Sequence, residues 1–289
     1  MEIHSFQELY GRELDVSGLT HKKLDIAYGP YERNVLDIYW PEEEKMWYPV
    51  IVFIHGGGFF KGDKRKYQLA PALQGLKQGY AVVSINYRMM QTDPFPAQIH
   101  DAKTAIRWLK ANADELELDT DRMAVWGESA GAMLACLIGA TQHGQLEDLS
   151  MGHPGQTTDV SAVVDWYGPT DLYYMETHTP KLMFDETYTL NEMLFREKMG
   201  DSLKRRMAEA NPGMYLHERM PAFLIEHGTA DDVVPMEISE AFREQLLTLL
   251  PKEKVEFYTV EGAGHGVSEF STQENLERVF RFLDRWVRR

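Results

Sequence analysis

The stretch Gly127-Glu128-Ser129-Ala130-Gly131 decides the fold, because it joins an expected strand to an expected helix with a serine at the bend. The apolar run before it, residues 122–126, is typical of a buried strand, and the run after it, residues 132–138, is typical of an apolar helix. A G-x-S-x-G nucleophile elbow requires this context. The first and last positions must be small, since the strand and helix backbones pass close together. The pattern predicts Ser129 as a nucleophile, with the amide of Ala130 facing a developing negative charge.

The same pentapeptide has a simpler interpretation, a Gly-rich strand–helix turn with a capping serine, because three fixed positions in five also match by chance. The rest of the chain decides between the two. Strand-like and helix-like patterns alternate along it, which predicts an α/β protein with a mostly parallel, doubly wound sheet, helices on both faces and an antiparallel start. The expected strands are residues 24–28, 35–39, 50–54, 81–85, 122–126, 160–167, 222–226 and 255–260, and the expected helices are residues 67–78, 99–112, 132–138, 236–250 and 272–287.

Neither an internal repeat nor a low-complexity linker divides the 289 residues, which predicts a single domain over residues 1–289. Residues 171–220 interrupt the alternation and are too long for an ordinary connection. Insertions of this size often cover a binding site, so a small cap or lid is expected here. Phe195, Met199 and Tyr215 either face a substrate or pack the insertion onto the body.

Composition excludes several classes of partner. The net charge of −15, from 30 basic and 45 acidic residues, argues against nucleic acid and anionic membranes. No apolar stretch approaches the roughly 20 residues of a membrane span. Residues 1–5 lack the basic and apolar pattern of a secretory signal, and Cys136 is the single cysteine and an expected core residue. These features predict a cytoplasmic protein.

Three further motifs bear on Ser129. His55-Gly56-Gly57-Gly58-Phe59 directly follows the expected strand 50–54. Acyl transfer forms a tetrahedral oxyanion that needs preorganised N–H donors, and glycines let the backbone approach it. Gly57 and Gly58 are therefore the predicted donors together with Ala130, and His55 is expected to brace their loop. A phosphate-binding loop is disfavoured, because the characteristic lysine and Ser/Thr are absent.

The other two motifs supply an acid and a base. Residues 227–235 follow the strand 222–226, and Asp231 is favoured over Asp232 as the acid that orients a histidine. Residues 262–266 form a Gly-rich loop after the last strand, which presents His265 as the base. The remaining histidines, lacking such a context, are expected to be surface or core residues. The order of serine, acid and histidine along the chain is that of α/β-hydrolases and differs from two protease orders.

With these motifs the chain resembles α/β-hydrolases of the HGGG-type carboxylesterase group related to hormone-sensitive lipase. It is particularly similar to the bacterial acetylesterases and carbohydrate esterases of the BD-FAE kind. The resemblance implies an eight-stranded α/β-hydrolase sheet, and a pairing of Arg88 with Asp101 that supports the oxyanion loop. The long apolar N-terminal cap of the larger lipases is not seen, which argues against long-chain triglycerides. The resemblance begins near residue 28 and includes residues 34–39, 86–88, 95–97 and 166–171.

The expected function is hydrolysis of short-chain, acetyl-like esters by Ser129, Asp231 and His265 through an acyl-enzyme, without a metal or other cofactor. The expected partner is a small-molecule ester, with acylated carbohydrates among the candidates, and the oligomeric state stays open. An arylformamidase and a small serine peptidase are alternative enzymes, since both use the same apparatus. The alternative of another class is a non-catalytic hydrolase fold that binds a ligand.

Overall fold

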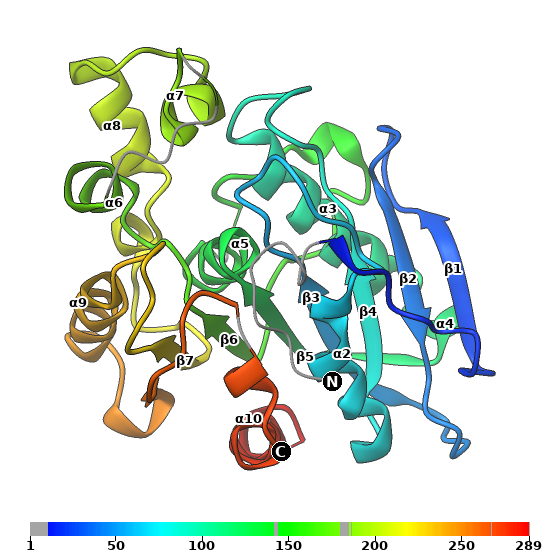
Figure 1. The fold of residues 1–289 in the computed structure, drawn as a ribbon. Coiled ribbons are helices and arrows are strands. Elements are labelled where there is room, and N and C mark those ends of the chain that lie inside the picture. Colours follow the sequence, from blue (N-terminus) through cyan, green and yellow to red (C-terminus); the bar gives the residue numbers. More distant parts are fainter. Residues whose placement is uncertain (1–10, 142–143, 180–184, 186, 267, 289) are drawn as a thin grey trace.

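A computed structural model describes residues 11–141, 144–179, 185, 187–266 and 268–288 of the chain. Residues 1–5, from which the lack of a signal is predicted, lie outside the described residues. The centre is one eight-stranded sheet in the order β1-β2-β4-β3-β5-β6-β7-β8 (Figure 1). Pairing is antiparallel between β1 and β2 and between β2 and β4, and parallel elsewhere, which confirms the predicted sheet. The strands are β1 (Lys22–Ala27), β2 (Val35–Tyr39), β3 (Tyr48–Ile54), β4 (Ala81–Ile85), β5 (Leu118–Glu128), β6 (Ala162–Trp166), β7 (Ala222–Gly228) and β8 (Val255–Val260).

Helices cover both faces of this sheet, because its central strands are apolar on both sides. Along β3, Val52 packs toward one face and Phe53 toward the other. The first face is covered by α3 (Ala97–Ala111), α5 (Ala130–Ala140) and α9 (Met236–Leu247), and the second by α2 (Ala70–Leu73) and α10 (Gln273–Val287). A short helix, α4 (Ala113–Leu116), leads from α3 into β5. Cys136 is fully buried on α5, as expected of a core residue.

The segment 67–78 is helical throughout, as predicted, but it is not one regular α-helix. The segment forms a 3₁₀ turn (Tyr67–Leu69), the single turn α2 and a second 3₁₀ turn (Gln74–Gln78). Pro71 explains the first break, because proline has no N–H to bond the carbonyl four residues earlier. The predicted stop at Gly79 is confirmed, since this residue has a left-handed φ of 80°.

The described part of the insertion between β6 and β7 contains three α-helices that lie together at one end of the sheet (Figure 1). They are α6 (Leu172–His178), α7 (Leu190–Phe195) and α8 (Asp201–Glu209). Residues 180–184 and 186 of the predicted cap lie outside the described residues. Thr189 begins α7 with a capping box to Glu192, which fixes the start of that helix. None of the helices described has the length and apolar composition needed to cross a bilayer.

Candidate active site

Ser129 sits between the end of β5 and the start of α5 in a backbone conformation that side chains rarely adopt, with φ 52° and ψ −121°. Its N–H donates to the Trp166 carbonyl at 2.9 Å, which holds the turn against β6. A Cβ at Gly127 would lie 2.2 Å from the Gly131 oxygen, and one at Gly131 would lie 2.1 Å from the Ile54 oxygen. Only glycine fits at both positions, so the predicted elbow is present.

A row of hydrogen bonds runs from Ser129 to Asp231 through His265. His265 Nε2 lies 2.8 Å from Ser129 Oγ, and His265 Nδ1 lies 2.7 Å from Asp231 Oδ2. A carboxylate can only accept, so Nδ1 carries the proton and Nε2 accepts from the serine hydroxyl. The structure therefore brings together the three predicted residues, which are 102 and 34 positions apart along the chain. Asp232, the alternative acid, is exposed.

The carboxylate of Asp231 is held on both oxygens. Oδ1 accepts from the backbone N–H groups of Val233 and Val234, each at 2.9 Å. Oδ2 faces His265 and also His227, whose Nε2 lies 3.2 Å away. Burial alone would raise the pKa of Asp231, but the hydrogen bonds from His227 and His265 outweigh it and hold that pKa below its usual value. Asp231 is therefore ionised at neutral pH.

Sequence reasoning missed His227, which was expected to be an ordinary surface or core residue. The signal that could have found it is its position on β7, four residues before the predicted acid. A histidine and an aspartate separated by one tight turn after the same strand can meet. The side chains of both are fully buried.

The glycine loop after β3 borders Ser129. Gly58 and Ala130 line the same cavity as Ser129 Oγ. Gly57 forms the turn behind them with a φ of 116°, and a Cβ there would lie 2.1 Å from the Lys61 oxygen. His55 is fully buried, stacks on Tyr87 at 4.5 Å and has a pKa that burial lowers to about 4. A buried His55 that stacks on Tyr87 fits the predicted bracing role.

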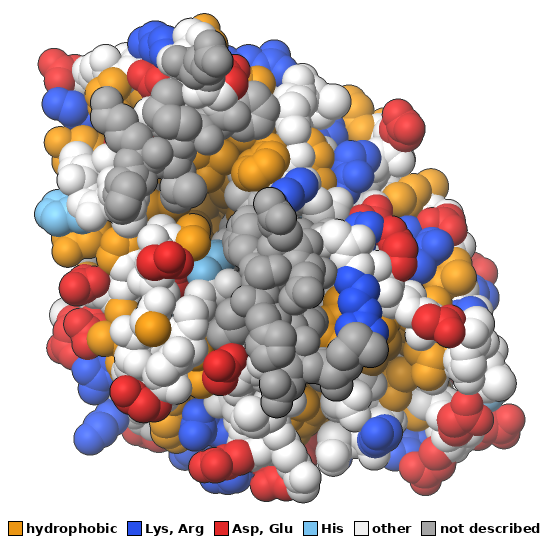
Figure 2. All heavy atoms as spheres, viewed as in Figure 1, with side chains coloured by type: hydrophobic (Ala, Val, Ile, Leu, Met, Phe, Trp, Pro, Cys, Tyr) orange, Lys and Arg blue, Asp and Glu red, His pale blue; other side chains and the backbone are white. Residues whose placement is uncertain are grey.

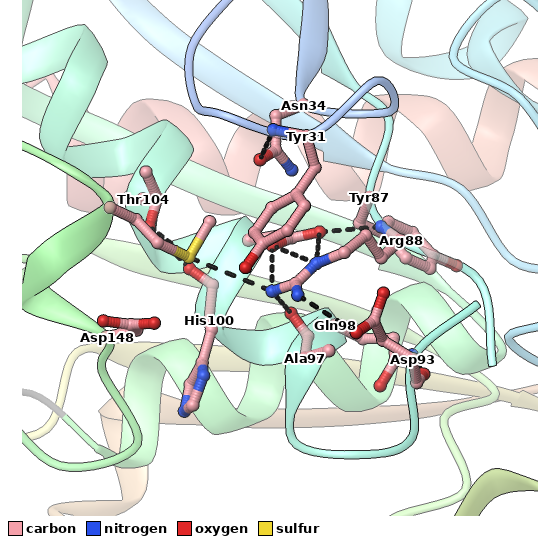
Figure 3. A network of polar contacts seen from close by, with 12 residues as sticks. Tyr31, Asn34, Tyr87, Arg88, Asp93, Ala97, Gln98, His100, Thr104 and Asp148 are labelled. Atoms are coloured by element: carbon pink, nitrogen blue, oxygen red, sulfur yellow. Dashed lines mark hydrogen bonds and ion pairs between the residues drawn. The ribbon is translucent and has the colours of Figure 1, made fainter.

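The predicted pairing of Arg88 with Asp101 is observed. Figure 3 shows Arg88 within its network of polar contacts, with Tyr31 beside it. The guanidinium Nη2 donates to Asp101 Oδ1 at 2.7 Å, the Arg88 N–H donates to Oδ2 at 2.7 Å, and the ring of Tyr31 lies over the guanidinium at 3.8 Å. This pair fixes the chain segment that touches the glycine loop. On that segment the Tyr87 hydroxyl donates to the His55 carbonyl at 2.9 Å, and the Met90 N–H donates to the Phe59 carbonyl at 2.9 Å.

A small cavity of about 120 Å³ opens beside Ser129 and His265. Figure 2 shows hydrophobic side chains gathered on this face below α7 and α8. Phe195, Met199 and Tyr215 do not line the cavity; Phe195, for example, packs on Phe95 at 5.6 Å between ring centres. Two segments contribute apolar side chains to the lining: the insertion, and the loop after β7 that carries Asp231 (the acid loop). These side chains are Leu172, Met175, Leu190, Leu194, Val233 and Val234.

Glu128, the residue before Ser129, is a buried carboxyl group with neutral partners. Its Oε2 accepts from Gln68 Nε2 at 2.8 Å. Burial raises the pKa of Glu128 to about 8, against smaller opposing effects of hydrogen bonds from Gln68 and Tyr167. The carboxyl group is therefore mostly protonated at neutral pH.

This buried acid predicts a loss of stability as the pH rises. Between the unfolded pKa of about 4.3 and the folded value of about 8, the native state holds a proton that the unfolded state releases. Each pH unit in this window then lowers the free energy of unfolding by up to about 1.4 kcal/mol. We expect Glu128→Gln to flatten this slope in urea titrations at pH 5 and pH 8, whereas Glu253→Gln, at an exposed position, leaves it unchanged. Parallel slopes in wild type and Glu128→Gln would contradict the assignment.

The sheet order, the strained serine between β5 and α5 and the serine–histidine–aspartate row define the class of the protein as an α/β-hydrolase. The chain belongs to the BD-FAE family, whose family model matches residues 36–246.

Several proteins with similar sequences or structures are named esterases. Esterase LipC of Mycobacterium tuberculosis is 30% identical over 246 residues, which are 83% of this chain and 59% of LipC. A solved structure named as a truncated form of carbohydrate esterase from gut microbiota is 27% identical, with a TM-score of 0.85 over 96% of this chain and 100% of its own. A bifunctional GH43-CE protein of Bacteroides eggerthii is 33% identical, with a TM-score of 0.80 over 91% of this chain and 38% of its own. The matched part of the chain spans between about half and three fifths of the length of the esterases LipC, LipM and LipQ.

Proposed function

We propose that this chain is a serine carboxylic-ester hydrolase that acts on short acyl esters. The observation that carries the proposal is the row of hydrogen bonds from Ser129 through His265 to Asp231 at the wall of a small apolar cavity. The esterase names of the similar proteins support the reaction class.

In the proposed mechanism, His265 Nε2 takes the proton of the Ser129 hydroxyl as Oγ attacks the ester carbonyl. The carbonyl oxygen becomes an oxyanion, which the amides of Gly57, Gly58 and Ala130 stabilise. The protonated His265 then gives its proton to the departing alkoxide, which leaves an acyl-enzyme on Ser129. Water, activated by the same imidazole, attacks the acyl-enzyme and releases the acid and Ser129. Asp231 stays ionised and stabilises the imidazolium in both steps.

The size of the cavity supports a small acyl group. Its volume of about 120 Å³ is below the roughly 300–1,000 Å³ of pockets for drug-sized ligands. Leu172 and Met175 from α6 and Leu190 from α7 form part of its wall, so the insertion 171–220 acts as the proposed cap and limits the acyl length.

We expect kcat/KM on p-nitrophenyl esters to be highest for acetate to butyrate and to fall for longer chains. Leu190 lies over Gly58, where an added Cβ would be 3.5 Å from Leu190 Cδ2, and its side chain is only partly buried. Leu190→Ala should therefore shift the preference toward longer acyl chains without unfolding the core. Met214→Ala is the matched control, because Met214 is exposed and belongs to the same insertion. An unchanged chain-length profile in Leu190→Ala would contradict the acyl pocket.

The alcohol part of the substrate is tested with a second panel. The carbohydrate esterase similarity supports an acylated carbohydrate, so acetylated xylan and a feruloyl ester are compared with p-nitrophenyl acetate. N-formylkynurenine and a peptide p-nitroanilide test the arylformamidase and peptidase alternatives. Turnover of either amide above that of every ester would overturn the ester assignment.

A further inference from the structure

His227 has an unusual set of neighbours for a buried histidine. It is on β7, and its side chain is fully buried. Its Nε2 lies 2.9 Å from the Val234 carbonyl and 3.2 Å from Asp231 Oδ2, and its Nδ1 lies 2.7 Å from Ser239 Oγ on α9. One imidazole therefore links the strand, the acid loop and the helix that follows it.

The chemistry of these neighbours fixes where the ring holds its proton. The two groups beside Nε2, a carbonyl and a carboxylate, can only accept, so Nε2 must carry the hydrogen. Ser239 carries a hydroxyl that can donate to Nδ1 of this tautomer. The Val234 carbonyl and the Asp231 carboxylate thus select the tautomer that aims an N–H at Asp231, and the Ser239 hydroxyl is compatible with it.

The oxygen that receives this hydrogen bond is also the one that faces His265, whose Nδ1 lies 2.7 Å from Asp231 Oδ2. Oδ2 therefore lies between two histidine N–H groups, while Oδ1 is held by the backbone of Val233 and Val234. A carboxylate held at both oxygens cannot rotate, and its negative charge is shared between the two rings.

We infer that His227 is a positioning residue of the proposed esterase. It holds Asp231 Oδ2 toward His265, and its hydrogen bond to Oδ2 reduces the negative charge that this oxygen presents to His265. The inference rests on the proposed function. It assigns to His227 no contact with substrate, since His227 acts through Asp231.

This role predicts a change in the pH profile that a general loss of packing would not give. Without the His227 N–H, more negative charge stays on Oδ2 and favours the protonated form of His265. Protonated His265 cannot act as the base, so the acid limb of kcat/KM moves to higher pH. The looser carboxylate also orients His265 less well, which lowers kcat and leaves KM nearly unchanged.

The experiment measures kcat, KM and the pH profile with p-nitrophenyl acetate for the full chain. His227→Phe keeps the ring shape but removes both nitrogens; we expect kcat to fall on the order of 10–100-fold, with the acid limb at higher pH. His227→Gln restores an N–H donor and should recover part of both effects. Ser239→Ala, which removes the hydrogen bond at Nδ1 that holds the ring in place without emptying the core, should move both quantities in the same direction by a smaller amount. It also serves as the test if His227→Phe does not fold.

Two comparisons make the result specific. On an Asp231→Asn background, His227→Phe should cost little further activity, because its effect passes through the acid. Phe242→Leu is the control for packing: it loosens α9 against Phe223, 5.9 Å away between ring centres, and should lower thermal stability but leave the pH profile unchanged. A wild-type kcat and acid limb in both His227→Phe and Ser239→Ala would overturn the inference. Full activity in Ser129→Ala would instead overturn the proposed function, so the two failures are distinct.

Discussion

Replacing Ser129 with alanine is expected to lower kcat/KM on p-nitrophenyl acetate by a factor on the order of 10⁴–10⁶. The reason is that Ser129 Oγ is the group that His265 Nε2 contacts at 2.8 Å, and alanine leaves that base without a nucleophile to activate. The fold should be retained, because Ser129 Oγ serves no other hydrogen bond given by the described residues. The change also removes a side-chain atom from a strained turn and fills no space.

A covalent probe makes this result independent of the substrate. A fluorophosphonate should label the wild-type chain once, at the peptide that contains Ser129, and should not label Ser129→Ala. Ser161→Ala is the matched control, since its hydroxyl donates to the Asp121 carbonyl at 3.1 Å away from the cavity. Labelling of Ser129→Ala at another serine, with activity near the wild-type rate, would rule out the proposed nucleophile.

Asp231→Asn should have an effect nearly as large, a fall in kcat on the order of 10⁴-fold. Every neighbour of the carboxylate is a donor: the N–H groups of Val233 and Val234 at one oxygen, and His227 and His265 at the other. An asparagine offers one oxygen and one NH₂ group, so in either orientation an N–H faces an N–H. If the amide nitrogen faces His265, that ring must also change its tautomer and can no longer accept from Ser129.

The same mismatch is expected to lower the free energy of unfolding of Asp231→Asn by about 1–3 kcal/mol. The reason is that the buried N–H groups that face the asparagine NH₂ group lose their acceptor. Asp232→Asn is the matched control: it makes the same chemical change at the adjacent, exposed position, and should alter neither kcat nor the urea midpoint. The prediction is checked by steady-state kinetics and urea unfolding of both variants. If Asp232→Asn proved the more damaging, the acid would have been assigned to the wrong residue.

The parts of the fold that the sequence predicts correctly depend on local rules. The elbow is predictable because only glycine tolerates the contacts at 127 and 131. The stop at Gly79 is predictable because glycine readily adopts the left-handed conformation at a helix end. The segment 67–78 is helical as expected, but it mixes 3₁₀ and α turns, because Pro71 lacks the N–H that a regular α-helix needs there.

The site was predicted less completely than the fold. The placement of each candidate after its own strand brings Ser129, Asp231 and His265 together, since the carboxyl ends of parallel strands meet at one edge. The cavity could not be predicted, because its wall comes from side chains of α6 and α7, whose positions depend on how the insertion packs. His227 was missed for a related reason: its contact with Asp231 depends on the turn between them.

The long separation of Ser129 and His265 along the chain, 136 residues, means that the two side chains depend on different strands of the sheet. His265 is carried by the loop that follows β8, and β8 is the last strand of the sheet, paired on one side only. Local unfolding of β8 would separate His265 from Ser129, while Ser129 would keep its position between β5 and α5 in the folded core. The reactivity of Ser129 would therefore report whether β8 is paired with the sheet. A chain that is folded over most of its length would still lack activity if β8 were detached.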